Sequence, residues 1–152
     1  MNARRIHNIM LVDDDPDDCF LFRKALSDVD PAITLQFVSD CDELVPALDS
    51  NHPQIVFMDI NMPKKSGFDC VTEIRGLSRH AHLPVVMYSC SDQPTQVSRA
   101  FGSGVHLYLR KPSSYEGLVT SLRQILEMDW SEPDAIAERY HVDGAYHAYE
   151  VA

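Results

Sequence analysis

The sequence predicts an α/β protein built on one parallel β-sheet that carries helices on both faces. Short, unbroken apolar runs between turn signals recur along the chain, and amphipathic segments separate them. Such a run is typical of a strand buried on both faces, as in a parallel sheet. A chain of 152 residues is long enough for one domain of this kind with an ordinary core.

Five apolar runs are expected to be strands: residues 6–13, 33–38, 54–59, 83–89 and 105–109. The second run alternates more than the others, as an edge strand would. Right-handed crossovers between parallel strands then favour the order 2-1-3-4-5, a doubly wound, flavodoxin-like arrangement. Its switch point lies between the first and third strands.

Helices are expected between these strands, over residues 16–27, 41–49, 68–77, 93–101 and 113–128. Asp15 is a candidate N-cap for the first helix, Ser91 or Asp92 for the fourth, and Ser114 for the fifth. Four apolar residues of the first helix are expected to form one buried stripe: Phe20, Leu21, Ala25 and Leu26.

The net charge of −10 disfavours binding to nucleic acid. No apolar run approaches the roughly 20 residues that cross a membrane, and no amino-terminal signal pattern is present. The four cysteines match no zinc spacing, which favours an interpretation as small buried side chains. We therefore expect a cytoplasmic protein that contacts neither nucleic acid nor membrane.

Charged and hydroxyl side chains follow four of the expected strands. Asp13 and Asp14 follow the first strand and Asp59 the third, while Ser89 and Lys111 follow the fourth and fifth. The carboxyl ends of parallel strands line one crevice, so these side chains are expected to meet there. Three carboxylates would repel one another without a cation, which indicates a hard divalent metal with oxygen ligands.

These motifs resemble the receiver domain of two-component response regulators, over about residues 5–128. The resemblance is carried by Leu-Val-Asp-Asp at 11–14, Met-Asp-Ile-Asn-Met-Pro at 58–63 with Gly67, Ser89 after the fourth strand, and Lys-Pro at 111–112. It implies that Asp59 is the phosphoacceptor. It also implies that Asp13, Asp14 and Asp59 hold Mg²⁺ together with the carbonyl oxygen of Asn61.

The resemblance further implies a switch made of Ser89, Lys111 and Tyr108. Lys111 would contact the phosphoryl group, and the hydroxyl of Ser89 would move toward it. Movement of Ser89 vacates space into which the ring of Tyr108 can rotate, although a buried core tyrosine is an equally good interpretation of Tyr108.

The expected organisation is a receiver domain over residues 1–128 and a C-terminal extension over 129–152, with no separate output domain. Such a domain takes a phosphoryl group from a histidine kinase or a histidine phosphotransfer protein and signals through protein contacts. The size and the aromatic extension are compatible with chemotaxis-regulator-like or phytochrome-response-regulator-like members, and with a homodimer. The extension itself could dock on the body, form a dimer contact or be mobile.

Two other classes of function are weighed against this interpretation. A phosphatase or phosphotransferase with an aspartyl-phosphate intermediate would carry an acid two residues after Asp59, where Asn61 stands. A flavodoxin-like cofactor-binding protein would carry a Ser-, Thr- and Gly-rich loop after the first strand, where three aspartates and Pro16 stand instead. We therefore expect a signalling domain rather than an enzyme acting on other substrates.

Overall fold

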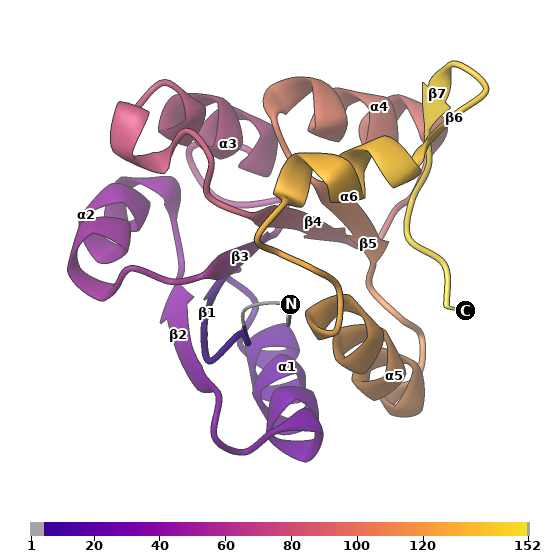
Figure 1. Cartoon of the computed structure of the whole chain (residues 1–152). Coiled ribbons are helices and arrows are strands. Elements are labelled where there is room, and N and C mark those ends of the chain that lie inside the picture. The colour runs from indigo at the N-terminus through magenta and orange to yellow at the C-terminus, as the bar shows by residue number, and fades with distance from the viewer. Residues whose placement is uncertain (1–4, 152) are drawn as a thin grey trace.

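A five-stranded parallel sheet forms the centre of the protein, in a computed structural model that describes residues 5–151 (Figure 1). The strand order β2-β1-β3-β4-β5 confirms the flavodoxin-like arrangement predicted from the sequence. The strands are β1 (Asn8–Val12), β2 (Thr34–Val38), β3 (Ile55–Met58), β4 (Val85–Ser89) and β5 (Leu107–Arg110).

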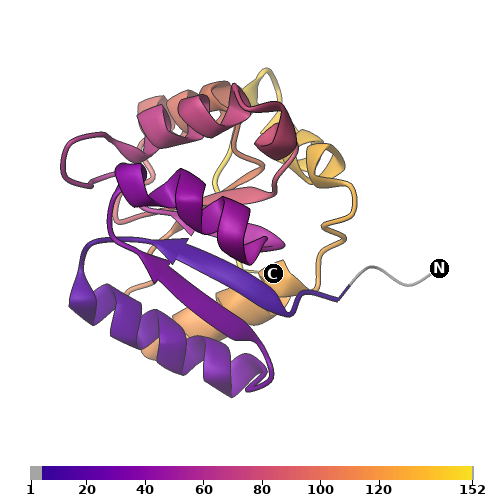
Figure 2. The same ribbon diagram turned by 90° about the vertical axis from the view of Figure 1, so that its left-hand side faces the viewer.

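Helices cover both faces of the sheet (Figures 1 and 2). They are α1 (Pro16–Val29), α2 (Cys41–Asn51), α3 (Gly67–Arg75), α4 (Pro94–Ser103) and α5 (Tyr115–Leu126), with a short 3₁₀ helix, η1 (Ser78–His80), after α3. Helices α1 and α5 pack on one face and α2, α3 and α4 on the other. No helix within residues 5–151 is long and apolar enough to span a membrane.

The two faces of the sheet have separate cores because successive strand residues point to opposite sides. Met10 and Met58 contact the core under α2, α3 and α4, whereas Leu11 and Phe57 contact the core under α1 and α5. All four side chains are fully buried. The three central strands are therefore held rigidly, and their carboxyl ends are fixed relative to one another.

The ends of most helices follow from local capping. The side chain of Asp15 accepts backbone N–H groups at the start of α1, and Ser114 does so at the start of α5, as predicted. The prediction for α4 was wrong, because its N-cap is Gln93, which makes no side-chain cap hydrogen bond. Pro94 at the first turn of α4 lacks an N–H group and so reduces the need for such a cap.

The apolar stripe predicted for α1 was wrong at two of its four positions. Ala25 and Leu26 are buried as expected, together with Phe22. Phe20 and Leu21 are instead 66% and 42% exposed. The helix therefore presents two large apolar side chains to solvent, on the part of its surface nearest the carboxyl end of the sheet.

The C-terminal extension docks back on the body along the β5 side of the sheet (Figure 1). It comprises helix α6 (Pro133–Arg139) and a small antiparallel hairpin of β6 (His141–Val142) and β7 (Ala145–Tyr146). The hairpin turns at Asp143 and Gly144, both of which have positive φ. Of the three arrangements left open by the sequence, the structure shows docking on the body.

Two of the four cysteines form a disulfide that was not predicted from the sequence. Cys41 at the start of α2 and Cys70 in α3 are both buried, with Cα atoms 5.7 Å apart. The expected burial is therefore confirmed for this pair, although the two side chains are bonded to each other, and it was wrong for Cys90, which is exposed. Only the fold brings the pair together, because 29 residues separate them in sequence.

Candidate functional site

Three carboxylates meet at the carboxyl ends of β1 and β3. Asp13 follows β1 and Asp59 follows β3, and the pairing of Val12 with Met58 places the two aspartates side by side. One carboxylate oxygen of each, and one of Asp14, lie within 4.8 Å of one another. Asp13 and Asp59 are buried, while Asp14 is exposed at the opening to solvent. The structure therefore brings together the acidic residues that the sequence predicted.

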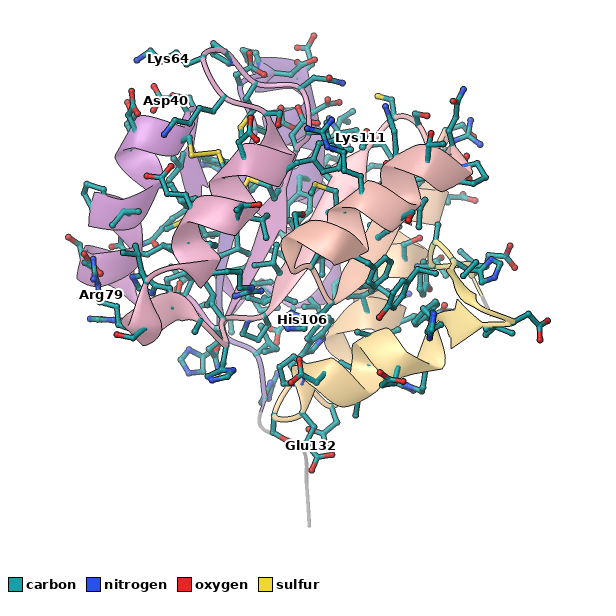
Figure 3. The ribbon with its side chains drawn as sticks, turned by 90° about the horizontal axis from the view of Figure 1, so that it is seen from above. Asp40, Lys64, Arg79, His106, Lys111 and Glu132 are labelled. Atoms are coloured by element: carbon teal, nitrogen blue, oxygen red, sulfur yellow. A yellow bond between two sulfur atoms is a disulfide. The ribbon has the colours of Figure 1, made fainter. Side chains whose placement is uncertain are left out.

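Lys111 is the cation of this cluster and reaches it from the end of β5. Its Nζ atom lies 3.0 Å from Oδ2 of Asp13 and 3.7 Å from Oδ1 of Asp59. Its shortest ion pair, at 2.7 Å, is with Asp18 in the first turn of α1. Figure 3 shows Lys111 toward one end of the molecule and Glu132 toward the other, with His106 between them.

Burial governs the protonation of the buried carboxylates. Removal from water, with a smaller contribution from the charge of Asp13, raises the pKa of Asp59 to about 6 against the lowering effect of Lys111. Backbone N–H groups of Asn61 and Ile60 also lower this pKa by donating to the carboxylate. Burial likewise raises the pKa of Asp13, although the N–H of Asp15 and the charge of Lys111 oppose it.

The donor set fits a hard divalent cation. Two buried carboxylates whose charge is poorly solvated gain from a cation, and an exposed third carboxylate leaves the site open to water and ligand. Mg²⁺ prefers such oxygen ligands and usually keeps several waters. Asn61 lies two residues after Asp59 in the exposed loop, where its carbonyl oxygen remains our predicted further ligand.

The two predicted switch residues lie on neighbouring strands. Ser89, the last residue of β4, is buried, and its Oγ accepts the N–H of Ser91 at 3.5 Å. Tyr108 on β5 is 0% exposed, and its hydroxyl donates to the carbonyl oxygen of Ser91. Burial raises the pKa of Tyr108, while a hydrogen bond with the Ser89 side chain lowers it. The ring is therefore already inside the protein, in contact with both serines.

Two residues contribute to this site in ways that the sequence analysis did not assign. Asp18 was interpreted as an acid favoured by the helix dipole, but it pairs with Lys111. Gly67 starts α3 directly against the strand end, because a Cβ at this position would lie 2.1 Å from the carbonyl oxygen of Asp59. Its position eight residues after Asp59, just past Pro63 and Ser66, was the only sequence signal for such a close approach.

A sizeable hollow lies away from this cluster. It has a volume of about 840 Å³, lies near the amino ends of the strands and is lined by residues that include His52, His82 and Trp130. A smaller hollow of about 460 Å³ borders Asp13 and Asp14 and is otherwise lined by side chains of α1, β2 and α2. The second of these hollows therefore adjoins the candidate site, and the first does not.

The comparison with protein families decides the class of this protein. A family model described as the response regulator receiver domain matches residues 9–123. The chain belongs to this family. The matched region includes all five strands apart from Asn8, and it contains each of the predicted site residues.

Individual relatives agree with this assignment. The chemotaxis protein CheY of Pseudomonas aeruginosa is 29% identical over 119 residues, which cover 78% of this chain and 95% of that protein. The phosphorylated cyanobacterial phytochrome response regulator RcpA has a structure with a TM-score of 0.73 and 25% identity, covering 84% of this chain and 96% of RcpA. The chain spans less than half the length of some other relatives, among them the transcriptional regulatory protein MalR of Bacillus subtilis, at 27% identity over 76% of this chain and 48% of MalR.

Proposed function

We propose that this receiver domain accepts a phosphoryl group on Asp59 from a phosphohistidine of a histidine kinase or histidine phosphotransfer protein, and that it signals by changed protein contacts. The observation that carries the proposal is the environment of Asp59. Its carboxylate is buried beside Asp13 and lies 3.7 Å from the ammonium of Lys111. This environment suits a nucleophile whose product carries additional negative charge.

The transfer itself requires positioning and charge stabilisation more than covalent help from the protein. An oxygen of Asp59 bonds to phosphorus while the bond between phosphorus and the donor imidazole breaks, and the imidazole leaves with the electron pair. Bound Mg²⁺, held by Asp13, Asp14, Asp59 and the carbonyl of Asn61, would neutralise charge on the phosphoryl oxygens. Lys111 neutralises a further oxygen and positions the product through a charge-assisted hydrogen bond.

Ser89 supplies the link from the phosphorylated site to the surface. Its hydroxyl is buried at the end of β4, where it can donate to a phosphoryl oxygen in place of its contact with Tyr108. The phosphoryl group would then change the hydrogen bonds of Tyr108. Tyr108 is thus the proposed switch residue between the site and the surface formed by α4, β5 and α5.

The surface of α1 next to the site offers a docking position for the phosphoryl donor. Phe20 and Leu21 are exposed there, and Phe20 also lines the hollow beside Asp13 and Asp14. Exposed apolar side chains of this size are candidates for a protein contact. Such a contact would hold the donor histidine at the opening near Asp14, in the cytoplasm where kinases form phosphohistidine.

The proposed organisation keeps residues 1–128 as the receiver and 129–152 as an extension that works with it rather than as a separate output domain. The chain acts on its own aspartate and not on a separate substrate. Self-phosphorylation and the later loss of the phosphoryl group are its only proposed reactions. Its cellular output is then a change in which proteins it contacts.

The proposal is tested with beryllofluoride, an analogue of the phosphoryl group, in the presence of Mg²⁺. We expect ¹⁹F NMR to show one bound species in the wild type and none in Asp59→Asn. We expect Asp14→Asn to bind Mg²⁺ at least tenfold more weakly, because one of three carboxylates is lost. The matched control is Asp17→Asn, an exposed acid in the same segment that contacts neither Asp59 nor Lys111 in the described structure. Bound beryllofluoride in Asp59→Asn would refute the assignment.

A further inference from the structure

The C-terminal extension contacts the α4–β5–α5 side of the body at separate points. Trp130, buried at the start of the extension, donates from Nε1 to the carbonyl oxygen of Ile125 in α5. The ring of Tyr146 stacks on Phe101 of α4, with centroids 4.2 Å apart and planes 8° apart. Tyr149 is also buried, so the extension is held along its length.

The backbone contact of the extension falls on the switch residue itself. The N–H of Tyr149 donates to the carbonyl oxygen of Tyr108 at 2.8 Å, and the Tyr149 hydroxyl donates to Gln124 of α5. Strand β5 lies at the edge of the five-stranded sheet, so this carbonyl points away from β4. The extension thus binds the open edge of β5 as an added extended segment does.

This cover explains why Tyr108 is 0% exposed although it lies on an edge strand. Its ring belongs to the same core cluster as Phe101, and Tyr146 and Ala148 of the extension pack against that cluster. A ring leaving the core toward the outer edge of β5 would meet these side chains. The docked extension therefore favours the buried position of Tyr108, with its hydroxyl on the carbonyl of Ser91.

We propose that residues 130–149 act as an intramolecular partner of the α4–β5–α5 surface, which holds the ring of Tyr108 buried and is thereby coupled to the occupancy of Asp59. This inference rests on the proposed function. The proposed coupling is positive, so that occupancy of Asp59 and docking of the extension favour each other. Phosphorylation draws Ser89 toward Asp59 and leaves the hydroxyl of Tyr108 on Ser91, which is the arrangement that the docked extension stabilises.

Coupling between two binding events is reciprocal in free energy. The factor by which docking of the extension raises the affinity of Asp59 for the phosphoryl analogue must therefore equal the factor by which the bound analogue raises the equilibrium constant for docking. Typical coupling between two sites corresponds to a factor of about 5 to 150. In this proposal the extension occupies the α4–β5–α5 surface, which is the surface proposed above to contact other proteins.

The experiment measures hydrogen exchange of the Tyr149 amide in the full chain, with Mg²⁺ alone and with Mg²⁺ plus beryllofluoride. We expect exchange at least fivefold slower with beryllofluoride. In the reciprocal measurement, Tyr146→Ala removes the stacking partner of Phe101 and should weaken beryllofluoride binding at least fivefold. Val142→Ala is the control, because this hairpin residue is 49% exposed and belongs to neither core cluster.

The possible outcomes separate the two proposals. Absence of bound beryllofluoride in the wild type, by ¹⁹F NMR, would refute the proposed function. Bound beryllofluoride with unchanged exchange at Tyr149 would overturn the coupling and make the extension a passive cover. Faster exchange would also overturn it, because the extension would then be released rather than tightened. The exchange measurement uses the wild type alone, so it does not depend on the folding of any variant.

Discussion

Lys111 neutralises part of the negative charge of the site, because three acidic side chains lie around its ammonium group. Asp18 and Asp13 lie at 2.7 and 3.0 Å, closer than Asp59 at 3.7 Å. Burial disfavours the charged lysine, but Asp18, Asp13 and Asp59 together outweigh burial and raise the pKa of Lys111. Lys111 is thus held near Asp59 by the other two acids, in position to approach a new phosphoryl oxygen.

The pKa of Asp59 gives a prediction about stability and pH. Its folded-state value of about 6 lies above the ordinary 3.8, so folding is favoured by protonation of this group. That stabilisation is fully present below pH 3.8 and is lost as the pH rises through 6. Without Mg²⁺, ionised Asp59 then costs up to about 3 kcal/mol at pH 8.

We therefore expect the free energy of unfolding of Asp59→Asn to be about 1–3 kcal/mol higher than that of the wild type at pH 8. At pH 4 we expect the two values to differ little. Urea unfolding at both pH values without Mg²⁺ measures this. Asp17→Asn serves as the control and should follow the wild type. Mg²⁺ should stabilise the wild type but not Asp59→Asn, because it binds the folded carboxylate cluster. An equal difference at pH 4 and pH 8 would contradict the role given to burial.

At the scale of elements, the start of α3 depends on how closely it approaches the end of β3. Gly67 permits this approach, because its N–H donates to the carbonyl of Ile60 at 2.8 Å while no side chain separates it from Asp59. The loop between β3 and α3, which holds Asn61, is closed by this contact. The geometry of the predicted metal ligands is therefore tied to the absence of a side chain at residue 67.

We expect Gly67→Ala to destabilise the protein by about 1–3 kcal/mol and to weaken Mg²⁺ binding, because the new Cβ would force the backbone at Asp59 to move. Thermal unfolding and Mg²⁺ titration measure both effects. Gly102→Ala in α4 is the matched control, since nothing lies within 4 Å of its Cβ position. It should stabilise the helix by about 0.5–1 kcal/mol. Equal effects of the two substitutions would show that the close approach is unimportant.

The strands and their order were predictable because buried parallel strands are continuous apolar runs, and the site followed because polar residues end those runs. The burial of Phe20 and Leu21 was predicted wrongly, because the i, i+3, i+4 spacing of Phe22, Ala25 and Leu26 defines the buried side of α1 and leaves these two residues off it. The Cys41–Cys70 pair and the role of Asp18 depend on contacts between distant segments, which no local pattern encodes.

At the scale of the whole molecule, the extension determines which edge of the sheet is open. Strand edges expose backbone groups that can pair with another chain, and natural proteins often cover them. On the β5 side, the cover is formed by Tyr149 at the backbone and Tyr146 over Phe101. These aromatic residues of the extension were compatible with a homodimer contact in the sequence, but in the structure they contact the body of their own chain.

We predict that undocking the extension promotes self-association. In Tyr146→Ala/Tyr149→Ala, the edge of β5 and the ring of Phe101 become accessible, and an exposed edge beside an apolar patch favours pairing between copies. Sedimentation velocity over increasing concentration should show a larger average mass for this variant than for the wild type, with Val142→Ala matching the wild type. If the wild type and the double variant have the same mass at every concentration, the extension does not protect this edge. If the wild type is already a dimer and the double variant a monomer, the extension is a contact between chains in solution, and its docking within one chain would have to be abandoned.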